Sequence, residues 1–100
     1  MPRYLIHRKF SVTENEMPTV GRRSKEVAID QFPQIVWEHS HVVVHEDGMA
    51  WTYCVYEAPD IETVRRHAIA LGQHEYMIHE IVGDVTPADF PLERERDAVS

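Results

Sequence analysis

The sequence is poor in cysteine and has no long apolar run. Its single cysteine, Cys54, cannot form a disulfide within the chain. No window approaches the roughly 18 consecutive apolar residues that a membrane-spanning helix needs. Residues 1–6 enter a strand pattern at once, without the charged start, apolar run and small-residue cleavage site of a signal peptide. We therefore expect a cytoplasmic protein that does not associate with membranes.

Positive charge is also scarce. Lysine and arginine total 10 against 17 aspartates and glutamates, which gives a formal net charge of −7. Nucleic-acid binding requires a dense basic surface that neutralises phosphates, so we expect no nucleic-acid partner. The short pairs Arg8-Lys9 and Arg22-Arg23 lie among acidic residues, a pattern that is typical of solvated surface.

The rest of the composition fits one small globular domain. The 100 residues are 43% hydrophobic and 27% charged, which is ordinary for a soluble protein. The domain is predicted to cover residues 1–85, and residues 86–100 form a C-terminal tail. In the tail, Phe90 lies between two prolines, and we interpret that part as an arm on a partner. The charged run that follows, residues 93–97, is expected to be flexible.

Alternation of apolar and polar residues predicts four strands. Residues 3–10, 35–44, 49–58 and 77–85 each carry this period of two. The segment at 45–48 ends in Asp47-Gly48, which supplies the positive φ of a tight hairpin turn. The second and third strands are therefore expected to pair antiparallel.

Two helices separate these strands. The first is predicted to begin between Thr13 and Met17, because Pro18 fits only the first turn, and to end before Pro33. The second begins after Asp60, a favourable N-cap, and is expected to stop at Gly72.

The order strand–helix–strand–strand–helix–strand predicts a ferredoxin-like α+β fold. Its simplest form is a four-stranded antiparallel sheet with both helices on one face. The other sheet face is then bare, and in so small a domain a bare face usually meets a partner. The most economical partner is an identical chain across a twofold axis. We therefore expect a homodimer through this face, arranged as a dimeric α+β barrel.

Seven histidines are the most unusual feature of the composition. Strict alternation places His39 and His41 on one face of residues 35–44, together with Trp37. A two-residue or a four-residue hairpin loop would then set His41 or His39 opposite Cys54. His7 and His79 are assigned to the same bare face, because their strand neighbours Tyr4, Ile6, Ile78 and Val82 are better partners for the helices.

The predicted cluster is thus His7, His39, His41, His79 and Cys54. Side chains two apart on a strand are separated by roughly 6.5–7 Å, and cross-strand neighbours by about 5 Å. Imidazole nitrogens at such positions can share one ion with a thiolate, a ligand set that suits nickel, zinc or copper. Two other interpretations stay open: the histidines hydrogen-bond across a dimer interface, and Cys54 is a small buried hydrophobe.

Four further residues are assigned supporting roles. Trp37 and Tyr56 line a pocket beside the cluster or pack in the dimer. Glu57, like Tyr56, is a candidate to orient a metal ligand through a hydrogen bond. His67 lies at the edge of the apolar stripe of the second helix, where a structural hydrogen bond is the favoured interpretation.

Several segments resemble a widespread bacterial family of small proteins. They are WEHSHV at residues 37–42, CVYEAP at 54–59, VRRHA at 64–68, the opening MPRYLI and the closing IHEIV at 78–82. This family includes an actinobacterial nickel-binding protein with a dimeric ferredoxin-like fold. The resemblance implies the same fold and nickel as the metal. His7 and His41 depart from the family pattern, and each departure adds a potential ligand.

The leading hypothesis is a small cytoplasmic protein that binds a transition metal, nickel first, through the histidine and cysteine cluster. The alternative is a dimeric α+β barrel enzyme with a small organic substrate in a pocket lined by Trp37, Tyr56 and histidines. A third hypothesis is a plain interaction module. Because the sequence reveals no set of nucleophile, base and orienting residue, we rank the non-enzymatic role above the enzymatic one.

Overall fold

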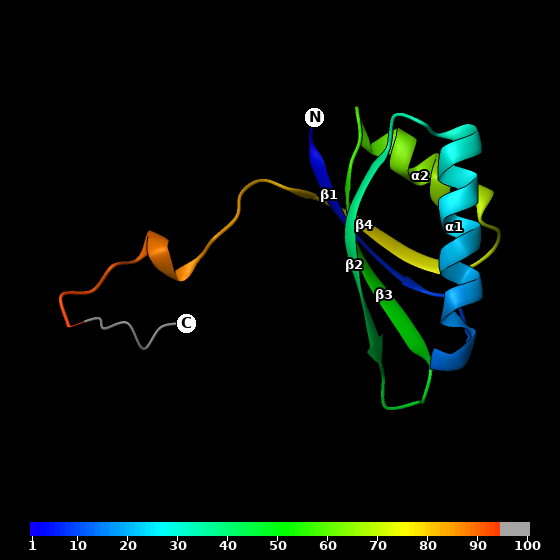
Figure 1. The fold of residues 1–100 in the computed structure, drawn as a ribbon, viewed down its shortest axis with the longest axis horizontal. Coiled ribbons are helices and arrows are strands. Elements are labelled where there is room, and N and C mark those ends of the chain that lie inside the picture. The colour runs from blue at the N-terminus through cyan, green and yellow to red at the C-terminus, as the bar shows by residue number, and fades with distance from the viewer. Residues whose placement is uncertain (95–100) are drawn as a thin grey trace.

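The computed structural model describes residues 1–94 (Figure 1). Its elements follow the predicted order, with a short 3-10 turn before the first helix and another in the tail. They are β1 (Arg3–Lys9), η1 (Glu14–Glu16), α1 (Met17–Gln31), β2 (Val36–Val44), β3 (Ala50–Glu57), α2 (Ile61–Ala70), β4 (Glu75–Ile81) and η2 (Pro87–Asp89).

The four strands form one antiparallel sheet in the order β2-β3-β1-β4. Both helices cover the same side of this sheet, and the other side carries no element of the domain (Figure 1). The predicted ferredoxin-like α+β fold is therefore confirmed. The last strand lies earlier than expected, because its partner β1 offers pairing positions only from Arg3 to Lys9, opposite Ile81 and Glu75.

The core lies between the centre of the sheet and α2. Strands β1 and β3 contribute Tyr4, Ile6, Cys54 and Tyr56, and α2 contributes Val64 and Ala68. The helix starts where predicted, since the Asp60 carboxylate accepts hydrogen bonds from the backbone N–H and the hydroxyl of Thr63, both at 2.8 Å. The first of these bonds satisfies one of the backbone N–H groups that the first turn leaves free. Both hydrogen bonds hold the pKa of Asp60 below its ordinary value.

Helix α1 covers the sheet less tightly than α2 does. It begins as predicted, with Pro18 in its first turn and a capping box between Thr13 and Glu16 in the preceding η1 turn. Of its own residues only Met17 and Ser24 are buried. The side chains of β2 beneath it, such as Val42, are about half exposed.

The hairpin between β2 and β3 differs from both registers considered from the sequence. Val44 pairs with Ala50, so residues 45–49 form the loop, and His41 lies opposite Tyr53. A loop with an odd number of residues changes the pairing by one position, which moves side chains to the other face relative to the predicted registers. A bulge between Trp37 and His39 then shifts the pairing by one more position, so these two side chains lie on opposite faces of the sheet.

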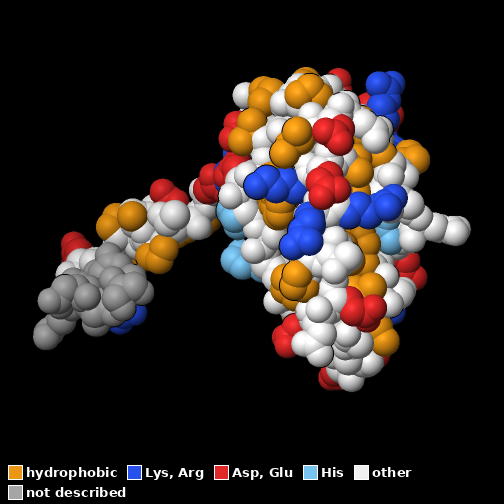
Figure 2. All heavy atoms as spheres, turned by 45° about the vertical axis from the view of Figure 1, so that its right-hand side comes forward, with side chains coloured by type: hydrophobic (Ala, Val, Ile, Leu, Met, Phe, Trp, Pro, Cys, Tyr) orange, Lys and Arg blue, Asp and Glu red, His pale blue; other side chains and the backbone are white. Residues whose placement is uncertain are grey.

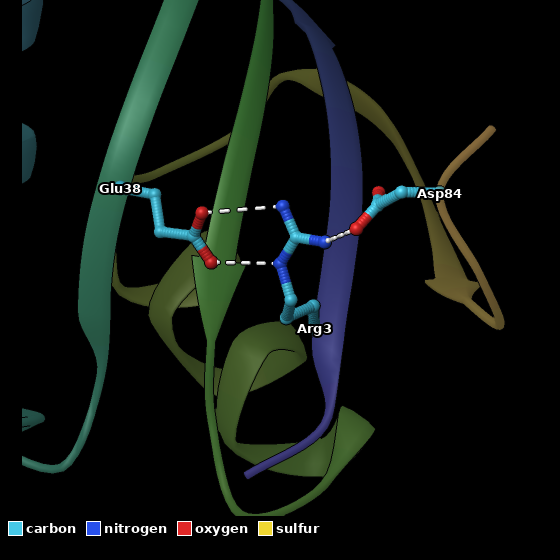
Figure 3. A network of polar contacts seen from close by, with 3 residues as sticks. All are labelled: Arg3, Glu38 and Asp84. Atoms are coloured by element: carbon cyan, nitrogen blue, oxygen red, sulfur yellow. Dashed lines mark hydrogen bonds and ion pairs between the residues drawn. The ribbon is translucent and has the colours of Figure 1, made fainter. Parts of the chain in front are cut away.

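The C-terminal segment leaves β4 on the bare side of the sheet (Figure 1). Arg3 anchors its start: one guanidinium nitrogen donates to Asp84 at 2.6 Å, and two others contact the Glu38 carboxylate at 2.9 and 3.2 Å (Figure 3). Part of the charged run predicted to be flexible lies outside the described residues. Within residues 1–94, no helix is both long enough and apolar enough to cross a membrane.

Candidate metal site on the open sheet face

One pair of histidines joins β1 and β4 on the open sheet face. His7 and His79 are diagonal neighbours, because His7 pairs with Met77 and His79 pairs with Leu5. Their Nε2 atoms are 3.3 Å apart, and their rings are nearly parallel, at 9° with centroids 5.4 Å apart. Two nitrogens bound to one ion at about 2.0–2.1 Å lie about 3 Å apart at a right angle and about 3.4 Å apart in a tetrahedral site. The pair therefore has the spacing of two ligands of one metal ion.

Aromatic contacts fix the orientation of the His7 ring. Tyr53 on β3 stacks on it with a centroid distance of 5.6 Å and an interplanar angle of 6°. Trp51 lies beyond, 6.2 Å from the His7 ring, and itself stacks on His45 at 4.7 Å. The His7 ring is thus held between Tyr53 on one side and His79 on the other.

A second pair of histidines lies on the edge strand β2. His39 and His41 are both exposed, and their rings meet edge to face with centroids 5.4 Å apart. They occupy the same two rows of the sheet as the first pair, since His39 pairs with Val55 and His41 with Tyr53. Strands β2 and β1 flank β3, so the two pairs are separated by about 10 Å across the sheet.

The expectation that Cys54 belongs to this cluster is wrong. Cys54 pairs with Ser40 rather than with a histidine, faces the helices and is 5% exposed within the hydrophobic core. The cause is the hairpin loop, whose odd length places His39 and His41 on the opposite face from Cys54. Cys54 is the small buried hydrophobe that the alternative interpretation described.

The supporting residues are divided between the two faces. Trp37 and Tyr56 pack edge to face at 6.5 Å on the helix-facing side, away from the histidine pairs. The expected pocket of Trp37, Tyr56 and open-face histidines is therefore wrong. The odd hairpin loop places Tyr56, like Cys54, on the opposite face from the histidines, and the bulge moves Trp37 to that face as well. Glu57 pairs with Arg3 and Val36 at the end of β3, on the histidine face.

His67 has the structural role favoured from the sequence. It is completely buried, and its Nε2 lies 3.1 Å from the Ser24 carbonyl oxygen, so Nε2 carries the proton and donates it. Its Nδ1 can then accept from Arg8 Nη2 at 3.4 Å. Burial lowers the pKa of His67 to about 4. The ring is therefore neutral near pH 7 and links the two helices to β1.

Sequence analysis missed Arg8. The side chain was interpreted as solvated surface, but it is 1% exposed and lies on the helix-facing side of β1. The alternation of β1 carries the signal, because Arg8 lies on the same face of the strand as Tyr4 and Ile6. The prediction of solvated surface rested instead on charge, since Arg8 and Lys9 form a short basic pair among acidic residues.

Charge on the face of the molecule that Figure 2 shows is mixed. In Figure 2, lysine and arginine side chains lie among aspartates and glutamates on the face shown, without a large area of one sign.

On the open face, Glu38 next to His39 is held by Arg3, and this hydrogen bonding lowers the pKa of the Glu38 carboxyl. Glu38 is therefore engaged with a cation of the chain itself.

The donor set fits nickel in chemistry but not in number within one chain. Imidazole nitrogens suit nickel, zinc and copper. Among residues 1–94, however, no group of three or more histidine, cysteine, aspartate or glutamate side chains lies close enough to hold one ion. Within the described residues, a single chain therefore offers paired imidazoles rather than a complete ligand set.

Comparison with known proteins supplies independent information. Residues 4–89 match the model of a protein family described as "Nickel responsive protein SCO4226-like". No curated protein sequence matches the chain. The family match agrees with the resemblance inferred from the sequence segments.

Solved structures agree on the fold. SCO4226 from Streptomyces coelicolor A3(2) is similar with a TM-score of 0.64 and 20% identity, covering 83% of this chain and 99% of that one. A de novo designed protein with a ferredoxin fold, LFR1 1, gives 0.54 at 12% identity, covering 96% of this chain and 98% of the design. Formyltetrahydrofolate deformylase from Burkholderia mallei gives 0.52 at 10% identity, covering 80% of this chain but 28% of the enzyme.

Proposed function

Since the chain belongs to the SCO4226-like family of nickel responsive proteins, we propose that it binds nickel at the open sheet face as a homodimer. The family description supports a nickel-related role, and the histidine pairs supply suitable donors. Zinc and copper are the alternative metals, because they accept the same ligands. A cytoplasmic location stays a prediction.

The observation that carries the proposal is the His7–His79 pair. Two Nε2 atoms 3.3 Å apart can bind one ion without rearrangement of the strands. The Tyr53 stack holds the His7 ring in this position, which reduces the entropy lost on binding. When bound, nickel would be held by imidazole nitrogens, and the chain's role is to fix their spacing.

The proposed dimer supplies the missing ligands. Apolar side chains around the histidines, Val36, Val43 and Met77, are 46%, 41% and 57% exposed on this face. A second copy would bury them, and face-to-face sheets pack about 10 Å apart, within reach of side chains. A twofold axis parallel to the strands and between the two histidine pairs would set His7 and His79 opposite the partner's own second pair. Two sites of four imidazoles would result.

The test is elemental analysis of untagged protein after exposure to a mixture of nickel, zinc and copper and desalting. We expect about one ion per chain, because two sites of four imidazoles would serve two chains. A His7→Ala/His79→Ala variant should lose it. Cys54→Ser is the matched control, and it should keep the metal because Cys54 lies on the other face.

Two further measurements sharpen this test. Analytical ultracentrifugation should show a dimer whose metal content falls together with its dimer fraction on dilution. Acidification toward about pH 5 should release the ion, since protons compete for imidazole nitrogens. Metal retained by the double histidine variant, or lost from Cys54→Ser alone, would contradict the proposed ligand set.

A further inference from the structure

A cavity lies on the other side of the sheet, between α1 and the strands β2 and β3. Its volume is about 430 Å³, within the range of small-molecule sites. The wall is largely apolar and includes Met17 and Val20 from α1 together with Trp37 and Tyr56 from the sheet. The cavity exists because α1 buries few of its side chains and leaves this part of β2 uncovered.

One cation lines this apolar cavity. Arg8 is 1% exposed, and its Nε and Nη1 atoms have no hydrogen-bond partner among the described residues. Its remaining polar contact is the 3.4 Å approach of Nη2 to neutral His67. The guanidinium carbon also lies 5.4 Å from the centre of the Tyr56 ring. None of these contacts neutralises the charge.

A second unsatisfied polar group lies beside the first. Thr52 pairs with Arg8 across β3 and β1, and it lines the same cavity. Its hydroxyl is buried and has no partner within residues 1–94. A guanidinium with free N–H groups and a free hydroxyl are therefore adjacent in one otherwise apolar wall.

This arrangement is costly unless an anion completes it. Arginine cannot lose its proton in a protein, and a buried charge without a partner is strongly destabilising. The one acidic residue that lines the cavity is Glu14, which is exposed in η1 and makes no ion pair with Arg8 in the described part of the chain. The cavity therefore has an unmatched positive charge.

We propose that this cavity binds a small organic carboxylate with an apolar body. One carboxylate oxygen would accept a hydrogen bond from a free N–H of the Arg8 guanidinium, at Nε or at Nη1, and the other oxygen would accept one from the Thr52 hydroxyl. The apolar body would contact Met17, Trp37 and Tyr56. One guanidinium and one hydroxyl fit a single negative charge better than a phosphate dianion, which takes more donors. This site is independent of the histidine pairs and of nickel.

The test is calorimetric titration of the full chain with matched acids and amides. The probes are phenylacetate and octanoate, with phenylacetamide and octanamide as neutral analogues. Each acid should bind at least about 10-fold more tightly than its amide, which corresponds to one charge-assisted hydrogen bond or more. Binding should also shift the NMR signal of the Trp37 indole N–H, which donates to Ser40 Oγ at 2.8 Å.

Two variants locate the site. Arg8→Met should lose the preference for acids while the ligand-free protein stays as stable as the original or becomes more stable, because an unpaired buried charge is removed. Arg22→Met on the exposed side of α1 is the matched control and should bind the acids unchanged. In a second variant, Gly21→Leu, the new side chain enters the cavity. No atom lies within 4 Å of a Cβ at Gly21, so the variant should fold normally and exclude the acids.

Several outcomes would overturn the proposal. They are no binding of either acid, equal binding of acids and amides, and full binding by Gly21→Leu. Nickel content is measured in the same samples. Loss of acid binding with unchanged nickel content, or the reverse, separates this site from the one on the open face.

Discussion

The two faces of the sheet use histidine in different ways. On the covered face, His67 is fully buried between the helices and β1, hydrogen-bonded at both ring nitrogens, and burial lowers its pKa to about 4. On the open face, His7 and His79 approach each other through Nε2 atoms and remain accessible to ligands from outside. The comparison teaches that burial and hydrogen-bond partners, rather than residue type, decide which histidines can bind a metal.

The faces also differ in what they leave unsatisfied. The open face exposes apolar side chains such as Met77 next to its histidines, which favours a partner chain. The covered face encloses an unpaired cation, Arg8, which favours a small anion. Each face is thus incomplete in a way that indicates its own kind of ligand.

The largest expected effect separates two neighbours on β1. Ile6 is completely buried against the helices, whereas Leu5 lies on the open face. Ile6→Ala should lower the free energy of unfolding by about 2–5 kcal/mol, the usual range for a large aliphatic core residue. Leu5→Ala should cost less in the monomer and weaken dimerisation instead. Urea unfolding at several protein concentrations measures both effects.

A concentration-independent loss of similar size in both variants would contradict the contrast between the faces. It would mean that the open face is packed within the single chain. If Leu5→Ala dimerises as well as the original protein, the proposed dimer through the open face is contradicted. The description of the core would be unaffected by that result.

The next effect is the pH dependence of stability due to His67. The unfolded chain takes up this proton near pH 6.5, whereas the folded chain does so near pH 4. Between these values the unfolded state binds more protons, so stability falls with decreasing pH, by up to about 2–3 kcal/mol. Replacing the side chain in His67→Gln should reduce this slope in urea unfolding curves measured from pH 7 to pH 4.

Some slope should remain in that variant, because burial also lowers the pKa of His74. His41→Gln on the open face is the matched control, and it should retain the full slope because His67 is unchanged. An unaltered slope in His67→Gln would show that the buried ring does not govern acid sensitivity.

The sequence predicted the fold because each element carried a local signal. Pro18 and Asp60 mark the two helix starts, and alternation marks the strands. The open-face positions of His7, His39, His41 and His79 followed from the same alternation. These signals need no knowledge of distant contacts, so they could be used residue by residue.

The missing part of the site depended on features that local patterns do not encode. One residue more or less in the hairpin loop decides whether Cys54 lies on the same sheet face as the histidines. The bulge in β2 likewise moves Trp37 to the face opposite His39. The charge pattern also predicted a solvated Arg8, although its place on the same face of β1 as Tyr4 and Ile6 indicated burial. The face of a strand residue is therefore well predicted within an unbroken strand, and poorly predicted across a bulge or a hairpin loop.

The smallest expected effect concerns the ion pairs that link β2, β1 and the tail. Arg3 makes two contacts with Glu38, whose side chain is 24% exposed, and one with Asp84, whose side chain is 68% exposed (Figure 3). Solvent screens such pairs, so Glu38→Gln should lower the unfolding midpoint only slightly, and Asp84→Asn should lower it less. Both differences should vanish at about 1 M salt. Because Arg3 lowers the pKa of Glu38, the contribution of this pair should also fade as the pH falls through the range in which carboxyls titrate. A large, salt-resistant loss in Asp84→Asn would mean that Asp84 stabilises the fold by more than this screened ion pair.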